Sequence, residues 1–280
     1  MPTVKVNGIE LYYVSQGSGT PVILVHELAM DAGGWQHQIP ALSRGHRVIA
    51  LNLRGYPPSA VPPDPAHYGH PQLVDDLDAF MRALDIPRAF IVGHGTGGNI
   101  ALSHALDKPD SVAGLVLVGA GAGNGNPGWK ERSTNFSKAV AEQGIRALRD
   151  SLASAPQRLP LQRKNPAAWQ AFLDSVEQLS AQGIANLMAN GVRNRPMFSD
   201  LEDQIRRFSR PLLIMVGDRD TPALEPSLYL ARTAAHAGLA VLPHTGHTLP
   251  LEEPELFNTL VSNFIQRALE GELPAPADRP

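Results

Sequence analysis

Short, uninterrupted apolar runs recur along the chain: PVILVH at 21–26, HRVIALNL at 46–53, RAFIVGH at 88–94, VAGLVLVGA at 112–120 and PLLIMVGD at 211–218. Runs of this length, bounded by Pro, Gly and charged residues, are typical of strands buried on both faces of a parallel sheet. The segment before them alternates apolar and polar residues around the turn dipeptide Asn7-Gly8. It predicts an antiparallel hairpin at the start of the chain.

Between these runs the apolar residues recur every three or four positions, which is the period of an amphipathic helix. In 71–84 the repeating positions are Leu73, Leu77, Phe80, Met81 and Leu84. Similar patterns follow Gly97 and Pro254. The alternation of strand and helix predicts an α/β fold, with a doubly wound, mostly parallel sheet of about eight strands.

The segment 123–208 breaks this alternation. Its Gly/Asn-rich opening is followed by helical periodicity around 134–153, 166–180 and 182–190, with no run that suits a buried strand. We expect a helical cap here, inserted between two strands and lying over their carboxyl ends, where open α/β sheets bind ligands. A purely structural helical subdomain is the alternative. The core domain is then divided into 1–122 and 209–280, and the Pro-rich tail of the second part is expected to fray.

Charge and composition narrow the classes of partner. Lys and Arg number 24 against 27 Asp and Glu, so the net charge is −3 and no basic field favours nucleic acid or an anionic membrane. The chain has no cysteine, which excludes disulfides, thiolate nucleophiles and cysteine-bound metals. No segment reads as a signal peptide or membrane span. We expect a soluble, cytoplasmic protein that takes a small-molecule substrate and needs no cofactor; a homodimer is left open.

The run at 88–94 leads through Gly93-His94-Gly95-Thr96-Gly97-Gly98 into a helical pattern. Strand, tight glycine turn and helix make up a nucleophile elbow, and here the chain resembles the α/β-hydrolase superfamily, whose elbow reads G-x-nucleophile-x-G. The resemblance extends over essentially the whole sequence and implies an esterase- or lactonase-like hydrolase with a cap. Gly95 stands at the nucleophile position. Because glycine has no side chain, no acyl-enzyme can form through it.

The other catalytic residues of the superfamily have counterparts. The resemblance selects Asp220, three residues after Gly217, as the acid, and His247 in the loop PHTGH as the histidine. Asp218 and His244 are nearby competitors that we interpret as loop residues. The second position at which the family can carry its acid, after the strand that ends near Gly119, holds no acidic residue.

A second departure from the family lies at 26–28, where His26-Glu27-Leu28 replaces the usual His-Gly. The dienelactone-hydrolase branch is similar in carrying a glutamate at this strand end, where it helps to control the nucleophile. Glu27 is therefore a candidate base, water-orienting group or ligand contact; the alternative is an ion-paired or solvated loop carboxylate. We expect it to face the pocket, with its pKa raised by burial unless a cation compensates. The Leu28 and Thr96 N–H groups would form the oxyanion hole.

Several large side chains are candidates for the substrate pocket, and they indicate an apolar or aromatic substrate: His26, His94, Trp35, Trp129 and Trp169, together with Tyr56 and Phe198. In the superfamily, histidines at the positions of His26 and His94 commonly make structural hydrogen bonds. A metal site is disfavoured because the histidines lack helical H-x-x-x-H spacing. The Thr96 hydroxyl is disfavoured as a replacement nucleophile because that side chain leaves the elbow in another direction.

Three hypotheses for function follow. In the first, the His247–Asp220 dyad is a general base that activates water or takes a substrate proton, for hydrolysis of an ester, lactone or carbon–carbon bond or for lyase-type chemistry. In the second, Gly95 replaces a natural serine and the native activity is that of a serine esterase or lactonase. In the third, the chain is a non-catalytic binding protein on a degenerate hydrolase fold.

Overall fold

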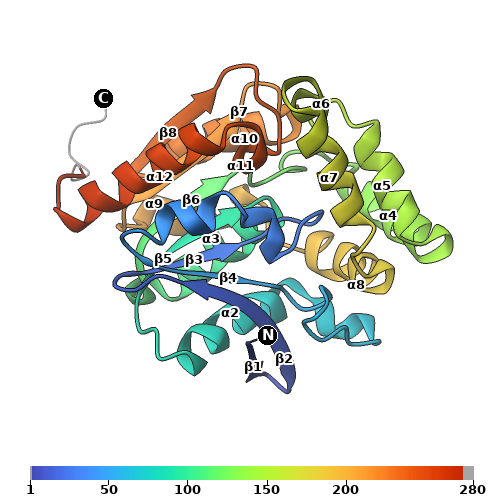
Figure 1. The fold of residues 1–280 in the computed structure, drawn as a ribbon, viewed down its shortest axis with the longest axis horizontal. Helices are drawn as coiled ribbons and strands as arrows, with labels where there is room; N and C mark the ends of the chain where they lie inside the picture. Colours follow the sequence, from blue (N-terminus) through green and yellow to red (C-terminus); the bar gives the residue numbers. More distant parts are fainter. Residues whose placement is uncertain (1, 274–280) are drawn as a thin grey trace.

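A computed structural model describes residues 2–273, and within them the predicted mostly parallel sheet of eight strands is confirmed (Figure 1). The strand order is β1-β2-β4-β3-β5-β6-β7-β8, with antiparallel pairing of β1 with β2 and of β2 with β4 and parallel pairing elsewhere. The strands are β1 (Thr3–Val6), β2 (Ile9–Gln16), β3 (Pro21–Val25), β4 (Arg47–Leu51), β5 (Ala89–His94), β6 (Val112–Val118), β7 (Leu212–Gly217) and β8 (Ala237–Leu242). The predicted fraying of the tail concerns mainly 274–280, outside the described residues.

The hairpin at the start of the chain forms as its turn dipeptide predicts. Asn7 and Gly8 both have positive φ, 47° and 79°. This is the conformation of the two-residue turn that matches the twist of antiparallel strands, and Asn-Gly adopts it readily. The hairpin prediction is confirmed.

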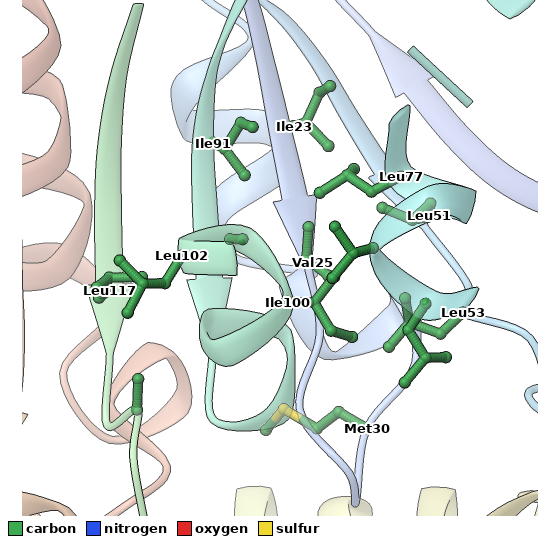
Figure 2. Packing of buried hydrophobic residues seen from close by; sticks show 14 of the residues in the cluster. Ile23, Val25, Met30, Leu51, Leu53, Leu77, Ile91, Ile100, Leu102 and Leu117 are labelled. Carbon is green, nitrogen blue, oxygen red and sulfur yellow. The ribbon is translucent and has the colours of Figure 1, made fainter. Parts of the chain in front are cut away.

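The central strands are buried on both faces because successive side chains point to opposite sides of the sheet. In β3, Ile23 and Val25 pack into the core beneath α2 and α3, whereas Val22 and Leu24 pack against α1 and α12. Figure 2 shows the first of these layers, with Leu77 of α2 and Ile100 of α3 against the strands. The helices of the core domain are α1 (Gln38–Leu42), α2 (His70–Ala83), α3 (Thr96–Asp107), α10 (Thr221–Thr233), α11 (Leu249–Glu252) and α12 (Pro254–Leu269), with short 3₁₀ turns η1 (Ala32–Trp35), η2 (Pro65–Tyr68) and η3 (Pro109–Ser111).

The chain between β6 and β7 is helical, and none of its described residues joins the sheet. It comprises α4 (Trp129–Gln143), α5 (Ile145–Ala153), α6 (Leu159–Lys164), α7 (Pro166–Val176), α8 (Ala181–Asn186), the π-helical turn η4 (Leu187–Val192), η5 (Phe198–Leu201) and α9 (Glu202–Arg207). Figure 1 shows α4 to α8 gathered at one end of the sheet. The continuous helix expected over 134–153 is interrupted at Gly144, whose φ is 74°. The cap boundaries at 123 and 208 stay a prediction.

None of the helices within residues 2–273 combines the length and the apolar character that crossing a bilayer requires.

Candidate active site

The turn between β5 and α3 has the geometry of a nucleophile elbow. Gly95 lies at φ 52°, ψ −113°, a strained region for residues with a side chain. A Cβ atom added there would lie 3.2 Å from His247 Nε2 and 3.0 Å from Glu27 Cβ. Asn99, one helical turn further on, holds the turn by donating from Nδ2 to the Gly95 carbonyl oxygen at 2.9 Å. The space directly above Gly95 is therefore bordered by an imidazole and a carboxylate.

Asp220 and His247 meet, although they lie on separate loops. His247 Nδ1 donates to Asp220 Oδ2 at 2.7 Å, and both side chains are buried. Asp220 lies three residues after the end of β7 and immediately before α10. Gly119 makes this approach possible, because a Cβ there would lie 2.9 Å from Asp220 Oδ2 and 3.1 Å from His247 Nδ1. The dyad expected from the motif positions is thus present as a geometry, while its catalytic role stays a proposal.

The backbone of His247 is fixed from two sides. Its N–H donates to the carbonyl oxygen of Gln157 in the cap at 2.8 Å. Its carbonyl oxygen accepts a hydrogen bond from His94 Nε2 at 2.7 Å. Burial lowers the pKa of His94 to about 3, so that His94 stays neutral and acts as a structural donor. The imidazole of His247 is consequently held in one orientation, with Nε2 facing the elbow.

The charge state of His247 is set by two carboxylates. Burial works against the imidazolium, but attraction by Asp220 and hydrogen bonds to Asp220 and Glu27 outweigh it, and the pKa of His247 rises to about 9. Glu27 Oε2 lies 3.6 Å from His247 Nε2. At neutral pH the imidazole is therefore mostly protonated.

Glu27 faces the pocket and is held by an arginine from the cap. Arg158 Nη1 and Nη2 donate to the two carboxylate oxygens of Glu27 at 2.6 and 2.7 Å, and both side chains are buried. Arg158 lies between α5 and α6, where its guanidinium also stands 5.4 Å from the ring centroid of Phe172. No local sequence signal points to this partner, because no motif surrounds Arg158.

The Arg158 guanidinium decides the pKa of Glu27. Burial alone would raise this pKa, but attraction by Arg158, with a smaller contribution from His247, holds it well below its usual value. We expected burial to raise the pKa of Glu27 unless a cation compensated, and Arg158 is that cation. The carboxylate is charged at neutral pH, and its negative charge lies next to His247.

Two backbone N–H groups border the same space. Leu28 and Thr96 both line the cavity, and neither N–H donates a hydrogen bond within residues 2–273. Thr96 opens α3, where the first N–H groups of a helix have no partner in the preceding turn. The peptide that carries the Leu28 N–H is anchored through its Glu27 carbonyl oxygen, which His26 Nδ1 binds at 2.8 Å, and the Tyr56 hydroxyl donates to the next carbonyl oxygen, that of Leu28, at 2.8 Å. The two donors expected to form an oxyanion hole are free to do so.

A cavity of about 670 Å³ opens above the elbow, between the core domain and the cap. This volume suits a small organic molecule. From the core it is lined by Glu27, Leu28, Gly95, Thr96, Asn99, Gly119, Ala122, Asp220, Pro222 and His247, and Gly123 lines it from the start of the cap segment. From the cap it is lined by Trp129, Arg132, Ser133, Asn135, Phe136, Leu148, Ser151, Leu152, Gln157, Arg158, Met188, Val192 and Arg195. Of the tryptophans expected to border the pocket, Trp129 does so.

The other pocket candidates lie elsewhere. Trp35 is buried between His94 and Phe257 in the layer beneath α1 and α12, because its apolar ring completes that core. Trp169 packs with Phe172 inside the cap.

His26 also fails to reach the cavity. It is fully buried, its Nδ1 binds the Glu27 carbonyl oxygen at 2.8 Å, and its Nε2 accepts from the Leu53 N–H at 3.0 Å. The imidazole thus fixes the turn that carries Glu27. Together with His94, it has the structural role that the superfamily gives such histidines.

The remaining candidate residues also lie away from the lining of this cavity. Tyr56 is buried, and Phe198 borders a separate hollow of about 340 Å³ beside α10. Asp218 and His244 are loop residues: Asp218 Oδ1 accepts from the Thr245 N–H at 3.2 Å, and His244 is exposed.

Comparisons with known proteins agree with the fold of this chain. The sequence model of the alpha/beta hydrolase fold family matches residues 20–254. A thermophilic esterase from Thermogutta terrifontis has a similar structure, with a TM-score of 0.85 and 26% identity over 95% of this chain and 98% of the esterase. A protein of Variovorax paradoxus with the provisional name carbamate hydrolase RutD is 31% identical over 95% of this chain and 99% of its own length.

A further relative is longer than this chain. The dihydrolipoyllysine-residue acetyltransferase component of the acetoin cleaving system of Pseudomonas putida is 30% identical over 89% of this chain, which spans 64% of that protein. The family match and the fold together show that the chain belongs to the alpha/beta hydrolase fold family. The esterase and the Variovorax protein, both of which the chain matches over nearly their whole length, bear the names of hydrolytic enzymes.

Proposed function

We propose that this chain is a hydrolase of small esters or lactones in which water attacks the carbonyl carbon directly, without an acyl-enzyme. The observation that carries the proposal is the position of Gly95. A Cβ at residue 95 would lie 3.2 Å from His247 Nε2, so the dyad faces the point from which a nucleophile attacks, yet residue 95 supplies no attacking atom. The esterase of similar structure supports the choice of ester-type substrates.

The attacking water lies above Gly95 and contacts both His247 Nε2 and Glu27 Oε2. These two atoms are 3.6 Å apart, so one water can reach each of them within hydrogen-bonding distance. Glu27 fixes the orientation of the water. Because Arg158 donates to both carboxylate oxygens, Glu27 keeps its position while the proton moves.

Neutral His247 accepts the proton from the water. At pH 7, about two units below the pKa of about 9, roughly 1% of the imidazole is neutral. That small fraction is a far stronger base than the Glu27 carboxylate, whose pKa lies well below its usual value. The imidazole, rather than the carboxylate, is therefore the general base, and Asp220 stabilises the imidazolium that forms.

The remaining steps balance the reaction. The water oxygen bonds to the carbonyl carbon, and the carbonyl oxygen takes the negative charge beside the Leu28 and Thr96 N–H groups. When the oxyanion collapses, the bond from carbon to the leaving oxygen breaks. The leaving oxygen takes the proton from His247 Nε2, so an alcohol and a carboxylic acid leave and His247 is again neutral.

Hydrolysis of 4-nitrophenyl acetate and butyrate tests the proposal, with intact-mass analysis of protein quenched during turnover. We expect steady turnover without a burst and no acylated protein. His247→Asn should lower kcat/KM about 100-fold or more, the usual contribution of a general base. The matched control is His244→Asn, on the exposed part of the same loop, which should leave kcat/KM unchanged. An acyl adduct, or full activity in His247→Asn, would contradict the proposal.

A further inference from the structure

Arg195 is a buried cation without an acidic partner. Its side chain extends from the segment after η4 to the cavity wall and is only 6% exposed. Within residues 2–273 its guanidinium binds two carbonyl oxygens, those of Ala122 and Val192, and forms no ion pair. Its Nε is enclosed without any hydrogen-bond partner there. Buried charges in proteins are ordinarily paired, so this arrangement requires another explanation.

The charged residues that line the cavity do not balance, because the basic groups outnumber the acidic ones. Glu27 is balanced by Arg158, and Asp220 by the protonated His247. Arg195 and Arg132 are left over, and Arg132, on the exposed side of α4, also forms no ion pair within the described chain. The cavity therefore carries excess positive charge and favours a ligand with negative charge.

The groups around Arg195 indicate where in the cavity a negatively charged group of a ligand would bind. The Arg195 guanidinium stacks on Trp129, with 4.8 Å from its carbon to the ring centroid. Ser133, one helical turn after Trp129 on α4, has a buried hydroxyl that lacks a partner among residues 2–273 and also lines the cavity. The guanidinium and the hydroxyl are both donors, and the indole that the guanidinium stacks on is flat and largely apolar. This combination suits a planar anion attached to an apolar body.

We propose that Arg195 forms an anion subsite that binds a carboxylate group of the substrate, so that the preferred substrate is an ester or lactone bearing a separate carboxylate. A single buried guanidinium matches the single charge and flat shape of a carboxylate. The inference builds on the proposed function in one respect only, that the substrate occupies this cavity. Burial also lowers the pKa of Arg195 to about 10, which reflects the cost of leaving its charge without an anion.

Binding of a matched pair of non-hydrolysable compounds tests the subsite without relying on activity. 3-Phenylpropionate and 3-phenylpropionamide have the same shape and differ in charge, and calorimetry at low salt gives their dissociation constants. We expect wild type to bind the carboxylate at least about tenfold more tightly than the amide, the usual gain from a charge-assisted hydrogen bond. Equal affinity, or no measurable binding of either compound, would overturn the proposal.

Substitutions then locate the anion. Arg195→Gln should abolish the preference for the carboxylate, whereas Arg163→Gln, on the exposed face of α6 away from the cavity, should retain it. Arg195→Lys keeps the charge without the fork and should retain part of the preference, which covers the case in which the glutamine variant fails to fold. If the preference survives Arg195→Gln and increases in Glu27→Gln, the carboxylate binds Arg158 instead and the proposal is wrong.

A kinetic comparison separates this inference from the proposed function. Mono-4-nitrophenyl glutarate carries a free carboxylate, and 4-nitrophenyl valerate is its neutral counterpart. Wild type should favour the glutarate ester in kcat/KM by at least about tenfold. If neither ester is hydrolysed while the carboxylate still binds through Arg195, the proposed function fails and the subsite stands. If both esters are hydrolysed with equal kcat/KM, the subsite fails and the hydrolase proposal stands.

Discussion

Arg158 of the cap donates to both carboxylate oxygens of Glu27, at 2.6 and 2.7 Å, and thereby joins the segment before α6 to the end of β3. Both partners are almost completely enclosed, with side-chain exposures of 6% and 2%. For a pair buried in this way, removing one partner costs more free energy than the intact pair contributes to stability. The reason is that the remaining charge is left buried and poorly solvated.

We predict that breaking this pair from one side is costly. Arg158→Met and Glu27→Gln should each lower the free energy of unfolding by about 3–5 kcal/mol, because each leaves a buried charge without its partner. The double variant should lose less than the sum of the two, since it buries no lone charge. Urea unfolding measures all three.

The exposed pair between Arg206 and Glu202 is the control for that experiment. Their side chains are 58% and 39% exposed, so water screens the pair and Arg206→Met should cause only a small loss of stability. A loss of this small size in Arg158→Met as well, or simple additivity in the double variant, would show that the buried pair is not coupled as described.

Residue 95 can be given the nucleophile that its position lacks. Gly95→Ser should hydrolyse 4-nitrophenyl esters with a burst and become labelled by an organophosphate, because its Cβ would lie 3.2 Å from His247 Nε2. Gly95→Ala is the matched control, with the same Cβ but no hydroxyl. Each variant should lose about 1 kcal/mol of stability or somewhat more at this positive φ.

The outcome for Gly95→Ser also separates the hypotheses left open by the sequence. High esterase activity that exceeds every reaction of the glycine form would favour a natural serine at this position. A folded serine variant that is neither labelled nor esterolytic would show that the dyad or the oxyanion hole is not functional, and would favour a binding role.

The raised pKa of His247 predicts a pH-dependent contribution to stability. The folded-state pKa of about 9 lies above the ordinary value of 6.5, so the folded state holds the proton more tightly. The contribution, of the order of 3 kcal/mol, is fully present below pH 6.5 and is lost as the pH rises through about 9. Unfolding free energies of wild type and His247→Asn should therefore converge over this range. A constant difference between them would contradict the prediction.

Much of the fold was predictable because the central strands are buried on both faces and read as continuous apolar runs. The edge strand β8 was not recognised, since Leu239 and Val241 are 39% and 43% exposed and the strand has no continuous buried run. The interruption at Gly144 was also missed, because helical periodicity continues across it.

The candidate site loops were predictable from the resemblance to the α/β-hydrolase superfamily, which places Gly95 at the elbow and selects Asp220 and His247. Arg158 and Arg195 were not, since nothing in the sequence tells which arginines of a helical segment turn inward over a distant strand end. Composition likewise could not separate Trp129, at the cavity, from Trp35, in the core. These assignments depend on how the cap packs on the sheet.

The dependence of kcat/KM on pH, for 4-nitrophenyl butyrate and corrected for uncatalysed hydrolysis, tests the central claim that neutral His247 is the general base. Wild type should gain about tenfold per pH unit and level off near pH 9, the pKa of His247. Glu27→Gln removes a negative charge beside the imidazole, so its rising limb should move to lower pH. A profile that falls as the pH approaches 9 would contradict the account, because the protonated imidazole would then be the active form.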